Sequence, residues 1–201
     1  MLNLPRSVPM VQGSADLREI DAAALHAYAS QWQPHLTGEP DADWTWASYI
    51  QGEGTEYGRR SNEFVAHCGL WSGNVLEGLI VLSGPHSCRS DAHADAPAVY
   101  IEFVAIAPWH RKIEGLSPPA GALLRTAGIG ACLMNEAIGL SHGCGYRGLV
   151  AWHSKDSAVT NYDRMFARTN GQTPLRCGTD DETGEVGMEL DATLVHGWRY
   201  P

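Results

Sequence analysis

The chain has 201 residues, 44% of them hydrophobic, and a formal net charge of −9. This length fits one domain with an ordinary buried core. The acidic balance argues against general affinity for DNA or RNA, which needs clustered Lys and Arg. No apolar run approaches the length needed to cross a bilayer, and the N-terminus lacks a signal-peptide core. We therefore expect a cytoplasmic protein without nucleic-acid or membrane partners.

The cysteine pattern indicates reduced thiols and no metal site. An odd, scattered set without a CxxC pair is typical of a cytosolic protein. The polar stretch that holds His86, Cys88, His93 and Asp95 fits no standard zinc spacing, so we expect a solvated loop there. The five cysteines are Cys68, Cys88, Cys132, Cys144 and Cys177.

The N-terminal third predicts one long helix. Residues 1–13 are expected to form an irregular lead-in. Apolar residues recur at helical spacing over 16–32 and predict a helix that Pro34 ends. Residues 44–50 could form a short helix or a strand. The aromatic residues of this third could form a wall over a substrate entrance, although core or interface packing also fits them: Trp32, Trp44, Trp46 and Tyr49.

Strand patterns dominate the middle of the chain. Two apolar segments, 63–71 and 75–84, flank the sequence Ser-Gly-Asn, which is a hairpin signal. Residues 86–97 read as a polar loop. Residues 98–108 then form a β-branched and aromatic strand that a proline ends.

The C-terminal half alternates helices and strands. Apolar residues on one helical face predict a helix from Ile129 onward, and residues 148–152 predict a buried strand. Residues 157–170 predict another helix, and 173–195 a terminal hairpin. The order of elements indicates an α/β (α+β-like) single domain over residues 1–201, with a mixed, mostly antiparallel sheet flanked by helices.

A glycine-rich motif lies between a strand and a helix. Residues 125–131 read Arg-x-x-Gly-x-Gly-Ala. Glycine at a helix start costs stability, so either the backbone turns tightly there or another group approaches it closely. The first N–H groups of a helix and its dipole favour phosphate. No P-loop run exists, and Leu133 stands where a Rossmann motif needs its third glycine. In the alternative interpretation, Gly128 and Gly130 only allow close packing between helix and strand.

Together with its neighbours, this motif resembles the GCN5-related N-acetyltransferases (GNAT). That family carries Arg/Gln-x-x-Gly-x-Gly/Ala after a strand that ends in a proline-containing turn. The segment YIEFVAIAPWHR looks like that fourth strand, and GYRGLVAWHS looks like the fifth. The segment AVTNYDRMF looks like the helix whose tyrosine reaches the thioester sulfur. The resemblance covers roughly residues 98–170 and implies the acyl-CoA N-acyltransferase fold.

The resemblance implies acetyl-CoA as co-substrate. In this family the pantetheine arm pairs with the splayed end of the fourth strand, which corresponds here to Val104, Ala105 and Ile106. A side chain at either motif glycine would block the approach of the pyrophosphate to the backbone. The residues implied to hold the pyrophosphate are Arg125, Thr126, Ala127, Gly128, Ile129, Gly130 and Ala131.

Acetyl transfer needs a base for the ammonium, a donor for the oxyanion and an acid for the thiolate. Tyr162 stands four residues after Ala158 and so resembles the family's acid; alternatively it only packs on the sheet. The oxyanion donor is expected to be a strand amide near Val104.

Two residues are candidates for the base. Glu102 is a carboxylate inside an apolar strand, which is costly unless it is paired or functional. It could act directly or through water, or it could form an ion pair with an arginine or a bond to a neighbouring strand. Strand alternation places it on the face of Tyr100 and Val104. His153, just after the fifth strand, is the second candidate.

The chain departs from the family pattern at three places. The connection between Arg111 and Arg125 is unusually long, and Lys155 replaces a common asparagine. Met165 and Phe166 replace the usual Gly-Phe. We expect an N-acetyltransferase that moves the acetyl group of acetyl-CoA to a primary amine of a small molecule or protein, and that could be a homodimer. The alternative is a non-catalytic acyl-CoA-binding sensor or interaction module.

Overall fold

The computed structural model describes residues 4–10, 14–39, 41–50, 64–111, 113, 115–123, 128–170, 173–179, 181 and 183–190. The helices are α1 (Ala22–Ala27), α2 (Trp46–Tyr49), α3 (Ile129–Gly143) and α4 (Asp156–Asn170). The strands are β1 (Arg6–Pro9), β2 (Ser14–Glu19), β3 (Phe64–Ser72), β4 (Val75–Ser87), β5 (Pro97–Ile106), β6 (Val150–Ser154), β7 (Leu175–Thr179) and β8 (Val186–Leu190).

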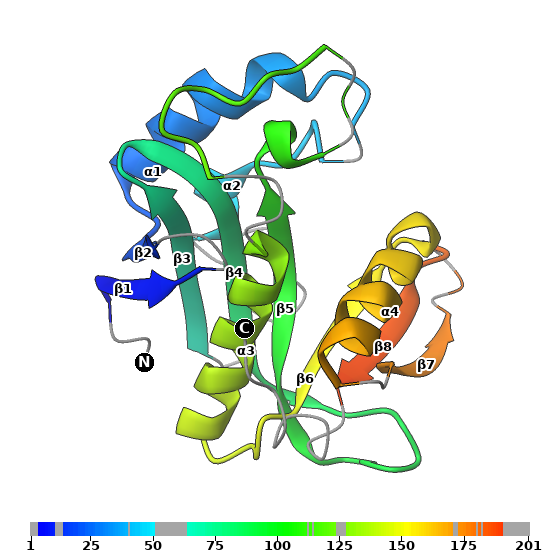
Figure 1. The fold of residues 1–201 in the computed structure, drawn as a ribbon. Coiled ribbons are helices and arrows are strands. Elements are labelled where there is room, and N and C mark those ends of the chain that lie inside the picture. Colours follow the sequence, from blue (N-terminus) through cyan, green and yellow to red (C-terminus); the bar gives the residue numbers. More distant parts are fainter. Residues whose placement is uncertain are drawn as a thin grey trace.

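These strands form one sheet in the order β1-β2-β3-β4-β5-β6-β8-β7 (Figure 1). Strands β5 and β6 are parallel, and the other neighbours are antiparallel. Helix α3 makes the crossover that two parallel strands need. The predicted mixed, mostly antiparallel sheet with flanking helices is confirmed.

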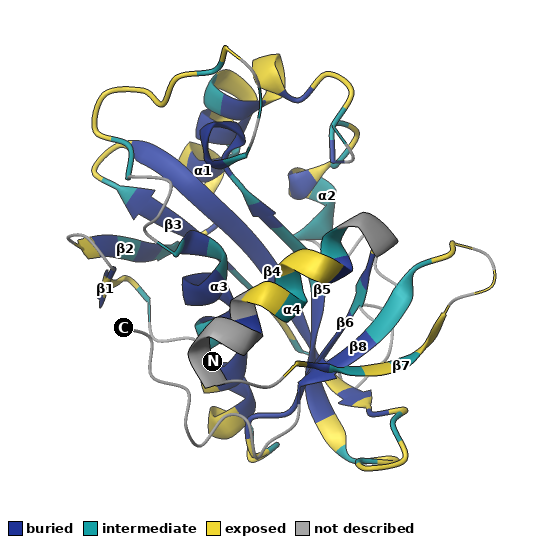
Figure 2. Cartoon of the chain, turned by 45° about the vertical axis from the view of Figure 1, so that its right-hand side comes forward, coloured by how far each residue is buried: buried dark blue, intermediate teal, exposed yellow. Residues whose placement is uncertain are grey.

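The core has a layer on each face of the sheet. Helices α3 and α4 cover one face, where Leu133 and Phe166 pack with strand residues such as Ile80 and Trp152. Helices α1 and α2 cover part of the other face. Figure 2 shows β4 as buried along nearly its whole length, while α4 exposes its outer side. In the described ranges, no helix combines the length and apolarity required to traverse a bilayer.

The N-terminal predictions were wrong in two places. Residues 6–9, expected to be irregular, form β1, which pairs with β2. Residues 16–19, expected to start the first helix, belong to β2, which pairs with β3 and buries Leu17 completely. The helix begins only at Ala22, where Asp21 caps it by accepting a hydrogen bond from Ala24 N at 3.0 Å.

The prediction that Pro34 ends the first helix was also wrong, because a π-helical turn (Tyr28–Trp32) and a 3₁₀ turn (Gln33–His35) follow α1 and include that proline. The helices and strands predicted from residue 63 onward are confirmed within the described residues. The hairpin of β3 and β4, the strand that a proline ends, the two long helices and the terminal hairpin lie where the sequence predicts them. Residues 46–49 are a helical turn, and Trp32 and Trp46 are fully buried in the core. All five cysteines are free thiols in the structure.

A bulge in β5 changes which side chains share a face. Phe103 pairs with Val81 and Ile101 pairs with Leu82, so Glu102 is an extra residue between them. The expectation that Glu102 and Val104 share a face was therefore wrong, because strict alternation requires an unbroken register. Val104 and Ile101 pack toward α3, whereas Phe103 packs on the α1 side.

Candidate active site

The parallel strands β5 and β6 separate after a short paired stretch. Their register joins Val99–Ile101 to Val150–Trp152, and the strands then diverge (Figure 1). Ala107 N donates to Glu77 O on β4 at 2.9 Å. The backbone N–H and C=O groups of successive strand residues point alternately to the two sides of the strand. Since those of Ala107 point toward β4, the N–H and C=O groups of Val104 and Ile106 point away from β4, toward the opening. The last residues of β5 thus present a backbone edge that β6 does not pair in the described part of the chain.

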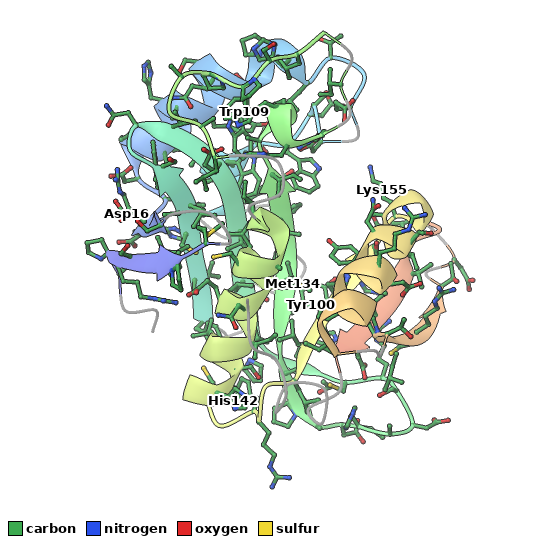
Figure 3. The ribbon with its side chains drawn as sticks, in the orientation of Figure 1. Asp16, Tyr100, Trp109, Met134, His142 and Lys155 are labelled. Carbon is green, nitrogen blue, oxygen red and sulfur yellow. The ribbon has the colours of Figure 1, made fainter. Side chains whose placement is uncertain are left out.

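A cavity of about 650 Å³ opens at this divergence. It is lined by β5, by the end of β6, by α4 and by the segment between α1 and α2. Figure 3 shows Tyr100 near the base of the opening, where β5 still pairs with β6, and Lys155 higher up, where β6 passes into α4. Five predicted site residues line it: Glu102, Val104, Ala105, Ile106 and Tyr162.

Tyr162 lines the cavity from α4. Its ring packs against Trp152 of β6, with a centroid separation of 5.3 Å. Burial raises the pKa of its hydroxyl to about 12, because the phenolate would be poorly solvated there. The side chain therefore carries a proton at neutral pH, as a proton donor must. Phe166 of the same helix stacks on Trp152, with a centroid separation of 6.1 Å.

Glu102 lines the cavity from the bulge of β5. Its Oε1 accepts a hydrogen bond from Ser83 Oγ on β4 at 2.5 Å. Ser83 is the cross-strand partner of Tyr100, so the carboxylate lies on the Tyr100 side of the sheet. Glu102 therefore forms a hydrogen bond to a neighbouring strand, which was one of the alternatives for this residue, and it also lines the cavity.

His153 is joined to a residue that the sequence argument named only as a neighbour of Glu102. Tyr100 Oη lies 2.5 Å from His153 Nδ1, and both residues line the cavity. Because Nδ1 is engaged, Nε2 is the ring nitrogen left to exchange a proton with a substrate. The sequence could not predict that these two residues meet, because this depends on the register in which β5 pairs with β6.

The glycine motif is described from Gly128 onward. Gly128 has φ of +78°, a left-handed conformation that favours glycine, and it precedes the first turn of α3. The side chains of Ile129 and Ala131 are buried, so only their backbone could meet a ligand. The N–H groups of a helix's first turn have no intrahelical acceptor. Arg125, Thr126 and Ala127 lie outside the described residues.

Close packing between helix and strand does not account for Gly130. A Cβ at this position would meet no atom within 4 Å. The close approach is made instead by Gly78 of β4, where a Cβ would lie 2.9 Å from Leu133 and 3.0 Å from Ile129. The tight contact between α3 and the sheet therefore depends on a glycine that the sequence argument did not single out.

The far end of the cavity is acidic and aromatic. Arg111 donates to both carboxylate oxygens of Asp41, at 2.6 and 2.5 Å, and to Glu39 at 3.3 Å. Its remaining donors bind Ile106 O at 3.1 and 2.9 Å, so its five N–H groups are all engaged. Beside them Trp44 packs edge-on against Phe103, with centroids 5.2 Å apart.

Of the proposed aromatic wall, only part faces the cavity. Trp44 lines it, whereas Trp32 and Trp46 belong to the core. Sequence reasoning missed the carboxylates of Glu39 and Asp41, whose polar, Gly-rich surroundings carry no periodic signal. No group of three or more potential metal ligands comes together among the described residues.

Solved acetyltransferases match this structure along most of its length. The GNAT domain of S. lividans PAT superposes with a TM-score of 0.54 and 12% identity, over 93% of this chain and 96% of that one. The PaiA N-acetyltransferase from Thermoplasma acidophilum, solved in complex with coenzyme A, gives a TM-score of 0.52 and 13% identity, over 88% and 98%. This chain has the GNAT fold.

The GNAT fold was therefore predicted correctly from the motif and its neighbouring elements. No protein-family model and no curated protein matches the sequence. At this level of identity the likeness establishes the fold, and the chemistry has to be argued from the residues around the cavity.

Proposed function

We propose that this protein is an N-acetyltransferase that moves the acetyl group of acetyl-CoA to a primary amine of a small molecule or protein. One observation carries the proposal. Among the described residues, β6 does not pair with the backbone edge at Val104 and Ile106, and this edge opens onto a cavity that also holds Glu102 and Tyr162. A GNAT-fold protein with these groups at one opening has a place for a thioester, a base and an acid.

The cofactor would bind along two backbone surfaces. The pantetheine arm would lie against β5 as an added strand. Because Arg111 occupies Ile106 O, the groups offered to it are the N–H and C=O of Val104 and the N–H of Ile106. The pyrophosphate would lie on the first-turn amides of α3, which no carboxylate of that turn opposes.

The reaction would proceed by direct attack of the amine on the thioester carbonyl. Glu102, or alternatively His153, would take the proton that the ammonium must lose. A carbon–nitrogen bond then forms while the amide N–H of Val104 donates to the oxyanion. The carbon–sulfur bond breaks as Tyr162 transfers its proton to the departing thiolate. The nitrogen, now bonded to the acetyl carbon, then loses its second proton to the tyrosinate, which leaves free coenzyme A, the acetylated amine and a neutral Tyr162.

The far end of the cavity supports a cationic acceptor. Glu39 and Asp41 together carry one more charge than Arg111 can balance, and Glu102 and Glu185 also line the cavity. An ammonium would be attracted to such a surface before it gives up its proton.

A thermal-shift titration with coenzyme A and acetyl-CoA tests the proposal. A ligand that binds only the native state raises its stability by about 2.7 kcal/mol at a hundredfold excess over Kd, so the Tm must rise. Free thiol should then appear when the acetyl-CoA complex is mixed with a panel of primary amines. No shift at millimolar ligand would rule out the proposed function. A shift without thiol release from any amine would instead favour the non-catalytic acyl-CoA-binding alternative.

A further inference from the structure

Two aromatic rings line the cavity beside its acidic end. Trp44 and Phe103 pack edge-on with ring centroids 5.2 Å apart, and we call them the aromatic pair. Tyr49 stacks on Phe103 at 3.6 Å with nearly parallel rings, and all three side chains are half-buried. The fully buried Trp46 supports Trp44 and Tyr49, with centroids 5.8 and 6.1 Å away. The aromatic pair therefore presents apolar ring surface to the cavity on a packed support.

The bulge in β5 places Phe103 at the cavity. Ile101 packs toward α3, so strict alternation along the strand would turn Phe103 toward α3 as well. Because Glu102 is the extra residue of the bulge, Phe103 packs instead on the α1 side, where it lines the cavity. A ring that regular pairing would have buried under a helix thus forms part of the wall of an open site.

Phe103 lies directly beside the groups that would act on the amine. It follows Glu102, a candidate base, and precedes Val104, whose N–H would donate to the oxyanion. Ser83, which binds Glu102, stands two residues after Val81, which pairs with Phe103. The carboxylate and the ring therefore lie on the same face of the sheet. Consecutive strand residues are only about 3.3 Å apart along the strand, so the part of an acceptor next to its amino group would contact this ring.

The charges at the acidic end suit an acceptor with one ammonium better than an acceptor with two. Arg111 donates to both oxygens of Asp41 and to Glu39, and the three side chains together carry one net negative charge. A second ammonium would have to share these carboxylates with the guanidinium, which would repel it. An apolar group in the same place would instead remove the ring surfaces from water, which is favourable.

We propose that the acceptor is a small primary alkylamine that carries an aromatic ring close to its amino group. Its ring would pack against Trp44 and Phe103, which would be the specificity-determining residues. Aromatic rings in edge-to-face or offset contact gain free energy beyond that of buried area. The proposal rests on the proposed function, since it names the class of amine that the same site would acetylate.

The first test compares four acceptors on the wild-type protein. Phenethylamine carries the ring, and cyclohexylethylamine has an apolar body without aromatic faces. Diaminobutane has a second ammonium in place of the body, and a peptide with a free N-terminus and one lysine represents a protein acceptor. Thiol release from acetyl-CoA gives kcat/KM for each.

Phenethylamine should be the best of the four acceptors. Its kcat/KM should exceed that of diaminobutane and of the peptide at least about tenfold, a difference of about 1.4 kcal/mol, because its ring becomes buried against the aromatic pair. Cyclohexylethylamine should fall between phenethylamine and diaminobutane, since it keeps the apolar area but lacks the aromatic faces.

Phe103→Ala and Trp44→Ala test the two rings separately. Each should lower the ratio of kcat/KM for phenethylamine to kcat/KM for diaminobutane about tenfold. Both amines are measured on the same protein, so a smaller folded fraction lowers both values and leaves the ratio unchanged. If either variant fails to fold, leucine at the same position keeps apolar packing and removes only the ring, and the ratio should still fall.

Tyr146→Ala is the matched control. Tyr146 is also a half-buried aromatic residue that packs on the core, but it lies outside the lining of the cavity. Its truncation should lower the Tm, because it removes apolar packing, and should leave the ratio of the two kcat/KM values unchanged.

Three results would overturn the proposal. The first is a wild-type protein that acetylates diaminobutane or the peptide at least as efficiently as phenethylamine, which leaves the proposed function intact. The second is a ratio that survives substitution of both rings, or that falls equally in Tyr146→Ala. The third is no thiol release with any of the four acceptors, which counts against the proposed function as well.

Discussion

At the scale of single residues, burial keeps the hydroxyl of Tyr162 protonated. The hydroxyl of Tyr162 has its pKa raised to about 12, so it remains protonated through the neutral range. Glu102 has Ser83 as a hydrogen-bond donor, and His153 has Tyr100 beside its Nδ1. The cavity thus offers one candidate acid but two candidate bases. A substitution of the acid, Tyr162, is therefore the easier one to interpret.

Substitution of Tyr162 by phenylalanine should lower kcat about a hundredfold, because general acid catalysis contributes on that order. The Kd of acetyl-CoA should change less than about twofold, since the ring still packs on Trp152. Thiol release under saturating acetyl-CoA measures the rate. Tyr146→Phe is the control, because Tyr146 is half-buried but lies outside the lining of the cavity. An unchanged kcat in Tyr162→Phe would remove this residue from the mechanism.

At the scale of elements, the open edge of β5 and the start of α3 are produced by different features. The bulge at Glu102 and the short pairing of β5 with β6 produce the open edge. A left-handed glycine and the packing of α3 on Gly78 produce the helix start. Gly130, by contrast, makes no tight contact, so its role can be tested separately from stability.

Gly130→Ala should leave the free protein as stable or stabilise it by up to about 1 kcal/mol, because alanine favours a helix and the added Cβ meets open space. The Kd of coenzyme A should rise at least about tenfold if phosphate approaches the backbone there. Thermal unfolding and calorimetric titration measure the two effects. Gly139→Ala is the control, because Gly139 is exposed on the same helix and its Cβ also meets open space.

That control should show the gain in stability without the loss of affinity. If Gly130→Ala binds coenzyme A as tightly as Gly139→Ala does, the glycine motif is not where phosphate contacts the backbone.

At the scale of the whole molecule, the buried thiols make stability depend on pH. Burial raises the pKa of Cys88 and of Cys132 from the ordinary value of 9.0 to about 12. In the unfolded chain these thiols lose their protons from about pH 9, whereas in the folded chain they keep them. Their contribution to stability is therefore complete below pH 9 and is lost as the pH rises toward 12.

The Tm should accordingly fall steeply above pH 9, with a loss of roughly 1.4 kcal/mol per pH unit for each of the two thiols. Circular dichroism melts between pH 8 and pH 11 measure the slope. The double variant Cys88→Ala, Cys132→Ala should be less stable at pH 7, because it removes buried side chains, but its Tm should fall less with pH. Equal slopes for the two proteins would contradict this explanation.

Most elements could be predicted because their patterns are local. The hairpin of β3 and β4, helix α3 and helix α4 each show their own periodicity. The strand character of residues 16–19 could not be predicted, because it depends on pairing with β3, some fifty residues away. Glu77 of β4 carried the same signal as Glu102, a carboxylate inside an apolar strand, yet the three groups that bind its carboxylate lie 32 to 46 residues away in the sequence.

The sequence by itself determined the order of the elements from β3 onward and the glycine motif that precedes α3. These follow from the chain's own periodicity and from short spacings, which need no distant partner. Only the tertiary structure decided that β5 bulges at Glu102, that Tyr100 joins His153 and that Phe103 lines the cavity. These depend on cross-strand register and on burial, and neither exists until the sheet has formed.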